Sequence, residues 1–233
     1  MTKHIPNLIT LGNLFCGTIA TIFAVQGNFE SAALFVVLGI IFDFFDGFAA
    51  RLLKVSGELG KQLDSLADMV TSGVVPGIIM YNLLDNTSHA VPSLKYFGLV
   101  LTLGACYRLA KFNIDTRQSD SFIGLPTPAM SLFIISLPLI QEYTTIEFVQ
   151  NLISNKYILT TITLLLTYLM NAELPLFSLK FKSYHFKNNV MKYFFLIASL
   201  ALLLTLKYIA IPLVILLYVA LSIISNFRKR TTA

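Results

Sequence analysis

Apolar stretches long enough to cross a lipid bilayer recur along the whole of this 233-residue chain. A spanning helix needs about 20 predominantly apolar residues, and eight segments approach that length: 5–26, 30–53, 60–84, 94–113, 127–142, 156–172, 190–206 and 208–227. Only 12% of the residues are charged, about half the share found in soluble domains, so a water-soluble globule is excluded. We predict an all-α integral membrane protein with about eight transmembrane helices, forming one membrane-embedded domain over residues 1–233.

The basic residues are distributed unevenly between the predicted loops. If both termini lie on one side of the membrane, that side holds 14 of the 17 Lys and Arg residues, and the other side holds Lys95, Lys156 and Lys207. Cytoplasmic loops carry the excess of Lys and Arg, so both termini are expected in the cytoplasm. The same distribution assigns the net charge of +5 to a membrane surface rather than to nucleic acid.

Four aspartates interrupt the apolar segments, Asp43 and Asp46 in the second and Asp64 and Asp68 in the third. A carboxylate at the centre of a spanning helix costs about 2.5–3.5 kcal/mol, so some partner must compensate them. Each pair is three or four residues apart and therefore shares one helix face. Because the connection around Gly57 is short, we expect the two helices to be antiparallel neighbours whose carboxylates converge near the cytoplasmic interface.

Carboxylates without a neighbouring histidine or thiol form a hard, all-oxygen site of the kind that Mg²⁺ or Mn²⁺ prefers. Two divalent ions would balance the charge of four carboxylates. Alternatively, the aspartates are ordinary interfacial residues solvated at helix ends. The small residues Gly47, Ala50 and Gly60 beside them leave room for a ligand to approach the backbone, and such residues also serve close helix packing.

This region carries a pattern of fixed spacing, DxxDGxxAR(x8)GxxxDxxxD. Its eight fixed positions are filled by Asp43, Asp46, Gly47, Ala50, Arg51, Gly60, Asp64 and Asp68. The pattern resembles the signature of the CDP-alcohol phosphotransferases. The resemblance implies a membrane enzyme, usually a homodimer, with a six-helix core and a site that faces the cytoplasm. Such enzymes transfer a substituted phosphoryl group from a CDP-linked donor to an alcohol and release CMP. The two helices at about 190–227 would be additions to this core.

The same resemblance implies roles for individual residues. Asp43, Asp46 and Asp64 would hold a divalent metal, with two ions expected, and Asp68 would be the general base and a further metal contact. The donor, CDP-diacylglycerol, would bind near residues that are mostly small, namely Thr10, Gly47, Ala50, Arg51 and Gly60.

Three further stretches are similar to the phosphatidylserine synthase branch of the family: Pro6-Asn-Leu-Ile-Thr10, Arg108-Leu-Ala-Lys-Phe-Asn113 and Gly124-Leu-Pro-Thr-Pro-Ala129. They imply serine as the acceptor alcohol. Serine carries a carboxylate, so its pocket needs a cation, for which Arg108, Lys111 and Arg117 are candidates, and Asn113 is available for the ammonium or the hydroxyl. Plain anchoring at the membrane surface is the alternative for these basic residues.

Two other interpretations of the chain stay open. The acceptor could be another alcohol, such as glycerol 3-phosphate or inositol. A cation transporter would also place carboxylates inside the membrane, but the chain contains no internal repeat, and its acidic residues gather near one membrane face. We expect a multi-pass protein of the cell's inner membrane.

Overall fold

The computed structural model of the chain describes residues 4–55, 57–87, 91–115, 123–177 and 186–231. Within these ranges the regular structure is helical, apart from one isolated antiparallel bridge between Ile123 and Pro175. The elements in chain order are α1 (Ile5–Val25), α2 (Phe29–Leu53), α3 (Glu58–Asp68), η2 (Met69–Val74), α4 (Val75–Thr87), η3 (Pro92–Leu99), α5 (Val100–Ile114), α6 (Thr127–Tyr143), α7 (Glu147–Ile153), α8 (Lys156–Asn171), α9 (Phe186–Leu206), η4 (Lys207–Ile209) and α10 (Ala210–Thr231). The prediction of an all-helical fold is therefore confirmed.

Each of the eight predicted apolar segments coincides with a helix or a run of helices. The third segment comprises α3, the π-helical turn η2 and α4, and the fourth comprises the 3₁₀-helix η3 and α5. The short helix α7 was not predicted, because its seven residues are too few to register as an apolar segment.

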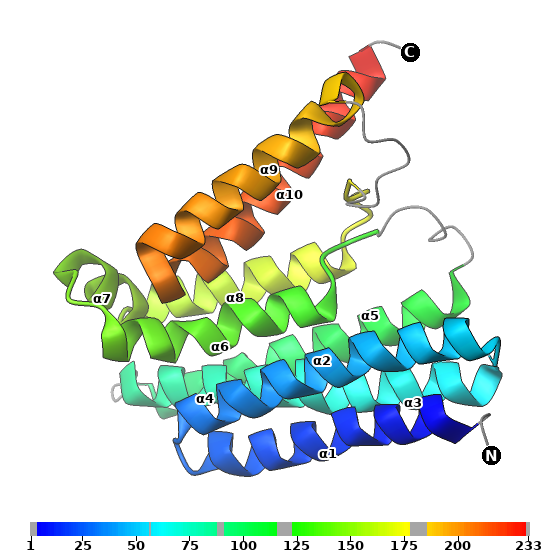
Figure 1. Ribbon diagram of the computed structural model, residues 1–233. Helices are drawn as coiled ribbons and strands as arrows, with labels where there is room; N and C mark the ends of the chain where they lie inside the picture. The colour runs from blue at the N-terminus through cyan, green and yellow to red at the C-terminus, as the bar shows by residue number, and fades with distance from the viewer. Residues whose placement is uncertain (1–3, 56, 88–90, 116–122, 178–185, 232–233) are drawn as a thin grey trace.

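Four stretches of the described chain are long and apolar enough to cross a membrane: Ile5–Val25, Phe29–Leu53, Glu58–Thr87 and Asn189–Asn226. The pair α7 and α8, bent by 68°, would be a fifth if it counted as one span. The last stretch holds two helices, since α9 and α10 reverse direction at Lys207, whose φ is +48°, and lie side by side (Figure 1). These helices fit a multi-pass membrane protein, and the count of eight spans stays a prediction.

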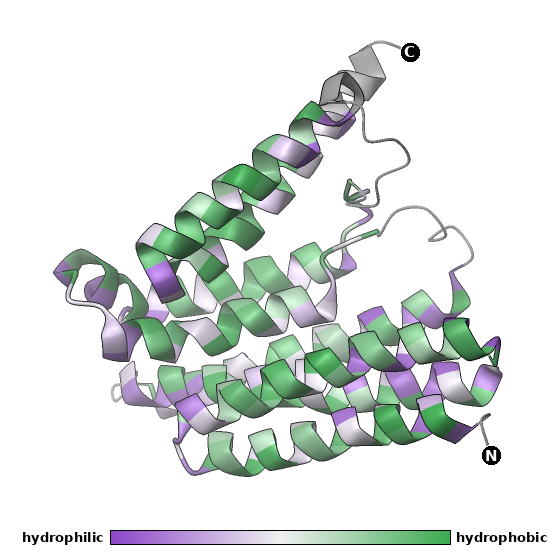
Figure 2. Cartoon of the chain, in the orientation of Figure 1, coloured by the Kyte–Doolittle hydropathy of each residue, from purple (hydrophilic) through white to green (hydrophobic). Residues whose placement is uncertain are grey.

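The helices form two unequal parts. Helices α1 to α6 and α8 pack into one bundle, while the hairpin of α9 and α10 leaves it at an angle (Figure 1). Of the bundle helices, α6 is the one that the hairpin mainly contacts. The long helices are hydrophobic over most of their length, with hydrophilic residues concentrated toward their ends and along α3 (Figure 2). In a bilayer, such apolar outer faces contact lipid rather than water.

Close helix packing next to the aspartates depends on two glycines. A Cβ atom on Gly17 of α1 would lie 2.2 Å from the Thr71 hydroxyl oxygen, and one on Gly39 of α2 would lie 2.7 Å from the Thr71 methyl group. Small residues let membrane helices approach one another in this way. As a result, Thr71 of η2 sits tightly between α1 and α2, one turn beyond Asp68.

Candidate active site

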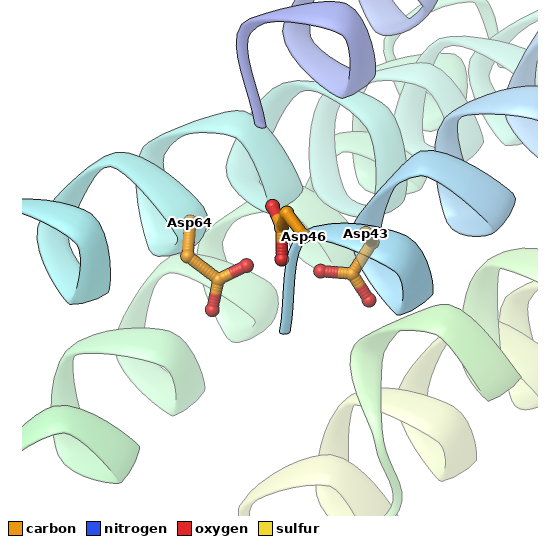
Figure 3. A group of neighbouring side chains, drawn as sticks. All are labelled: Asp43, Asp46 and Asp64. Atoms are coloured by element: carbon orange, nitrogen blue, oxygen red, sulfur yellow. The ribbon is translucent and has the colours of Figure 1, made fainter. Parts of the chain in front are cut away.

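Three of the four predicted aspartates form a cluster. Asp43 and Asp46 lie toward the end of α2, and Asp64 lies in α3. Each offers one carboxylate oxygen, and these oxygens all lie within 4.8 Å of one another. Figure 3 shows the three side chains converging from the two helices on one small space. The predicted convergence is thus confirmed for these three residues.

The helix that supports this cluster is α1. Helices α2 and α3 both pack extensively on α1 and make little direct contact with each other. The Thr10 hydroxyl of α1 lies 2.5 Å from Oδ2 of Asp46, and the Asn13 side-chain amide of α1 donates to Oδ1 of Asp68 over 3.1 Å. We expected α2 and α3 to pack directly as antiparallel neighbours. The third segment instead meets α2 through η2 and α4, which follow Asp68, and the carboxylates of α2 and α3 still approach one another closely enough to form the cluster.

Asp68 stands apart from the group of three. It is buried, with 8% of its surface exposed, and it does not share the 4.8 Å grouping of the other three carboxylates. It is nevertheless close enough to Asp64, Asp46 and the guanidinium of Arg108 to interact with them electrostatically. A buried carboxylate that receives one amide hydrogen bond keeps an oxygen lone pair free to accept a proton.

The cluster has a large excess of negative charge. In the described ranges, no Lys, Arg or His nitrogen lies within 4.0 Å of any of the four aspartates, since the ion pairs there join Lys95 to Asp85 and Lys111 to Glu173. Partly buried carboxylates without a cationic partner are unfavourable. A divalent cation would supply the missing charge, and its oxygen ligands are those that Mg²⁺ and Mn²⁺ prefer.

The geometry also suits such an ion. Mg²⁺ binds oxygen at about 2.1 Å, which places opposite ligands about 4.2 Å apart. The carboxylate oxygens of Asp43, Asp46 and Asp64 are within 4.8 Å of one another, so small side-chain rotations would bring them to bonding distance. The residues present therefore fit a divalent metal.

A cavity of about 240 Å³ opens beside the cluster. Residues of α1, of the end of α2 and of the start of α3 line it, among them Thr10, Asp46, Gly47, Ala50, Gly60, Lys61 and Asp64. A Cβ atom on Gly47 would meet nothing within 4 Å. Packing within the protein therefore does not require a glycine at position 47. A ligand that approached the backbone there would require one.

Arg51, which was predicted to bind the donor, does not line the cavity, whereas Lys61, which was not among the predicted site residues, does. The guanidinium Nε of Arg51 donates to the Gly47 carbonyl oxygen over 3.0 Å, so the side chain folds back along its own helix and does not line the cavity. Lys61 does line it, and its ammonium also donates to the Asn113 carbonyl oxygen. Lys61 was overlooked as a site residue. Its position in the first turn of α3, one residue after Gly60 of the pattern, was the available signal.

Arg108 is a buried cation without a complete set of partners. Its side chain is 7% exposed, and its Nε is a buried donor with no hydrogen-bond partner. It lines a narrow cavity of about 10 Å³ between α5 and the end of α8, together with Asn171, whose Oδ1 also lacks a partner. Asn171 was not among the predicted site residues. A buried donor and a buried acceptor left unpaired in one cavity indicate a place where a polar group binds.

The other predicted acceptor residues are less closely grouped. Lys111 shares the cavity with Arg108 and forms an ion pair with Glu173 at 3.3 Å. The Asn113 amide donates to the Ser65 hydroxyl over 2.9 Å, which ties it to α3 instead. Arg117 lies outside the described residues.

The chain is similar to proteins of one family. A family model described as CDP-alcohol phosphatidyltransferase matches residues 3–176. A protein of Bacillus subtilis (strain 168) named CDP-diacylglycerol–serine O-phosphatidyltransferase is 39% identical over 139 residues, which cover 58% of this chain and 75% of that protein.

More distant relatives carry related names. A protein of Helicobacter pylori (strain J99) with the same name is 37% identical over 132 residues, 56% of this chain and 55% of that protein. An archaetidylserine synthase of Methanothermobacter thermautotrophicus is 29% identical over 150 residues, 61% of each chain. The match thus spans three quarters of the Bacillus protein but less than two thirds of these other two.

Proposed function

The chain belongs to the CDP-alcohol phosphatidyltransferase family, and we propose from this that it is a phosphatidylserine synthase. It transfers the phosphatidyl group of CDP-diacylglycerol to the hydroxyl of L-serine and releases CMP. The observation that carries the acceptor assignment is the 39% identity to a relative named for this reaction. The aspartate cluster supplies the chemistry that the reaction needs.

Asp43, Asp46 and Asp64 would hold a divalent metal, with Asp68 as a further contact, and we propose two ions of Mg²⁺ or Mn²⁺. When bound, the metal neutralises the negative charge of the diphosphate and of the departing CMP. The protein's own part is to fix the ligands, and the Thr10 hydroxyl beside Asp46 restricts that carboxylate to one orientation.

Asp68 is the general base. The serine hydroxyl gives its proton to the Asp68 carboxylate, its oxygen forms a bond to the phosphorus attached to diacylglycerol, and the bond from that phosphorus to the CMP oxygen breaks. A general base must lie within hydrogen-bond reach of the proton it takes. The burial of Asp68 and the amide of Asn13 support this role, because together they hold one carboxylate near the metal ligands.

The cytidine diphosphate binds in the cavity between α1, α2 and α3. Thr10, Gly47, Ala50 and Gly60 lie at its walls. Lys61 provides a cation for the phosphates in the cavity, and Arg51 adds a second one when its side chain turns away from the Gly47 carbonyl oxygen. The acyl chains extend between helices into the lipid, an apolar phase that they never leave.

Serine binds on the other side of Asp68, where Arg108 faces its carboxylate. Support comes from the unpartnered Nε of Arg108 and from its longer-range electrostatic attraction to Asp68. Lys111, Asn113 and Arg117 complete the set of proposed acceptor residues.

The membrane arrangement is also a proposal. The uneven distribution of Lys and Arg supports both termini and the active site on the cytoplasmic side of the inner membrane. We propose eight spans, namely a six-helix core with the hairpin α9–α10 added, forming one catalytic domain, and a homodimer as the working unit.

The test is CMP release by the purified protein in detergent with CDP-diacylglycerol. Serine, glycerol 3-phosphate and inositol are supplied one at a time, with Mn²⁺, Mg²⁺ or EDTA. We expect release that requires serine and metal and is lost in Asp68→Asn. Release with a different alcohol alone would overturn the acceptor, and no release under any condition would overturn the enzyme.

A further inference from the structure

A second cavity lies where the C-terminal hairpin meets the bundle. Its volume is about 440 Å³, and it is lined by the end of α6 and by residues 206–209 at the turn between α9 and α10. Cavities of this size accommodate small-molecule ligands. None of the residues proposed for catalysis or substrate binding lines it.

This cavity and the aspartate cluster are at opposite ends of the helices. Tyr143, one of its lining residues, donates its hydroxyl to Glu30 in the first turn of α2, whereas Asp43 and Asp46 lie in the second half of that helix. Thirteen or more residues separate them, which at 1.5 Å per residue is about 20 Å along the helix. The cavity therefore belongs to the other membrane interface.

The lining is amphipathic. The rings of Tyr143 and Tyr208 lie against each other with centroids 5.3 Å apart, while Ile140 and Ile209 contribute apolar surface. Lys207 is the cation of the lining. Tyrosine and lysine side chains gather where the hydrocarbon of a bilayer meets its head groups.

The backbone at Lys207 fixes where this cation lies. Its φ of +48° is in the left-handed region, which residues with a Cβ rarely adopt and which Gly and Asn adopt more easily. A lysine at this turn thus supplies a charge where a neutral residue would suit the backbone better.

Most of the surface of the α9–α10 hairpin does not pack against the bundle and is free to contact lipid. Only 11% of the most apolar window of Asn189–Asn226 is buried against the rest of the chain, and the hairpin diverges from α6 and α8 away from its turn (Figure 1). Its faces are therefore exposed to bilayer lipid, and the cavity opens at the head-group end of that exposed surface.

We propose that this cavity binds one phospholipid of the bilayer through its phosphodiester. The phosphate lies at the Lys207 ammonium, the tyrosine pair flanks the glycerol, and the upper acyl chains pack on Ile140 and Ile209. The bound lipid joins the hairpin to α6. A phosphate is the lipid group that a single ammonium binds best by a charge-assisted hydrogen bond, and the apolar part of the lining favours a ligand that carries acyl chains over a free phosphate ion.

The test is lipid binding by the delipidated full chain in detergent, measured by native mass spectrometry and by thermal unfolding. Phosphatidylglycerol is compared with diacylglycerol of the same acyl chains and with inorganic phosphate. We expect one phosphatidylglycerol to bind with a higher unfolding temperature, and neither of the other two to do so. Equal effects of diacylglycerol and phosphatidylglycerol would overturn the role of the phosphate.

Substitutions at the turn separate a site from general lipid coating. Asn adopts the left-handed backbone conformation readily, so Lys207→Asn removes the charge without straining the turn. The affinity for phosphatidylglycerol should fall about tenfold, as when a charge-assisted hydrogen bond is lost. Lys207→Arg keeps the charge and should bind as the wild type does. Lys156→Gln is the matched control, because Lys156 starts α8 outside the cavity. Equal binding by wild type and Lys207→Asn contradicts the proposal.

Discussion

Asn13 of α1 donates its side-chain amide to Oδ1 of Asp68 of α3 over 3.1 Å. The orientation of this amide is fixed from its other side, because the Thr71 hydroxyl donates to Asn13 Oδ1 over 2.7 Å. With its oxygen occupied in this way, Asn13 can present only N–H to Asp68. The proposed base is thus held by a residue of a different helix.

Replacing Asn13 by Ala should lower kcat by about 10- to 100-fold, since a hydrogen bond to a charged group contributes about 1.5–3 kcal/mol. The KM for CDP-diacylglycerol should change little, because Asn13 does not line the donor cavity. CMP release at saturating substrates measures both. Thr71→Ser keeps the hydroxyl and should stay active, whereas Thr71→Val should lose part of kcat. An unchanged kcat in Asn13→Ala would show that Asp68 needs no such support.

Asp64 and Asp68 should respond differently to metal. Asp64→Asn removes one of the three clustered ligands, so the Mn²⁺ concentration for half-maximal activity should rise at least about tenfold, with partial recovery at high Mn²⁺. Asp68→Asn removes the proposed base and should stay inactive at every metal concentration. The measurement is a metal titration of CMP release. Full rescue of Asp68→Asn by metal would reassign Asp68 as a ligand only.

Gly47→Ala should separate stability from binding. An added Cβ meets nothing within 4 Å, and Ala is favoured over Gly in a helix by about 1 kcal/mol, so the unfolding temperature should be unchanged or higher. The KM for CDP-diacylglycerol should rise, because the Cβ enters the donor cavity. Gly17→Ala is the opposite control, since its Cβ would lie 2.2 Å from Thr71 Oγ1 and should lower the unfolding temperature. A normal KM in Gly47→Ala would place the donor elsewhere.

Lys61→Gln should raise the KM for CDP-diacylglycerol by about tenfold, the effect of losing one charge-assisted hydrogen bond to a phosphate. The matched control is Lys54→Gln. Lys54 is an exposed lysine just after α2 that does not line the cavity. The KM of Lys54→Gln for CDP-diacylglycerol should therefore stay near the wild-type value. Initial rates at varied donor concentration provide the comparison. Equal effects of the two substitutions would indicate a general surface charge rather than a phosphate contact.

Arg108→Gln should raise the KM for serine by about 10- to 100-fold through loss of the carboxylate partner. Ethanolamine, which lacks the carboxylate, tests the cause, because the rate of CMP release with ethanolamine should be the same in Arg108→Gln as in the wild type. Arg108→Lys keeps a charge and should be less impaired than Arg108→Gln, which guards against a folding defect. Serine and ethanolamine affected equally would exclude Arg108 as the carboxylate partner.

The helices and the clustering of Asp43, Asp46 and Asp64 could be predicted from the sequence. Apolar length predicts a membrane helix wherever it falls, and the spacing of Asp43 and Asp46 puts both on one face whatever surrounds them. The family resemblance is confirmed by the match over residues 3–176. These properties are local, so a single chain reveals them.

Properties that depend on helix partners were not predictable. That α1 supports both acidic helices follows from Gly17 and Gly39, which let Thr71 approach, and nothing in the local sequence distinguishes such glycines from others. Lys61 and Arg51 are equally basic in sequence, yet the Arg51 guanidinium bonds its own helix and Lys61 reaches the cavity. The direction of a long side chain is decided by its neighbours in space.

The number of residues in the π-helical turn η2 sets the rotation of α4 relative to α3, which carries Asp64 and Asp68. One residue of an α-helix corresponds to a rotation of about 100°, and π-helical turns accommodate an extra residue. If a deletion within residues 69–74 straightened this turn, then either Asp64 and Asp68 would rotate away from the metal ligands of α2, or the buried face of α4 around Ile79 and Leu83 would leave the core. A substitution keeps the register of both helices even where, as at Thr71, it weakens a contact, whereas an insertion or deletion in this stretch changes that register.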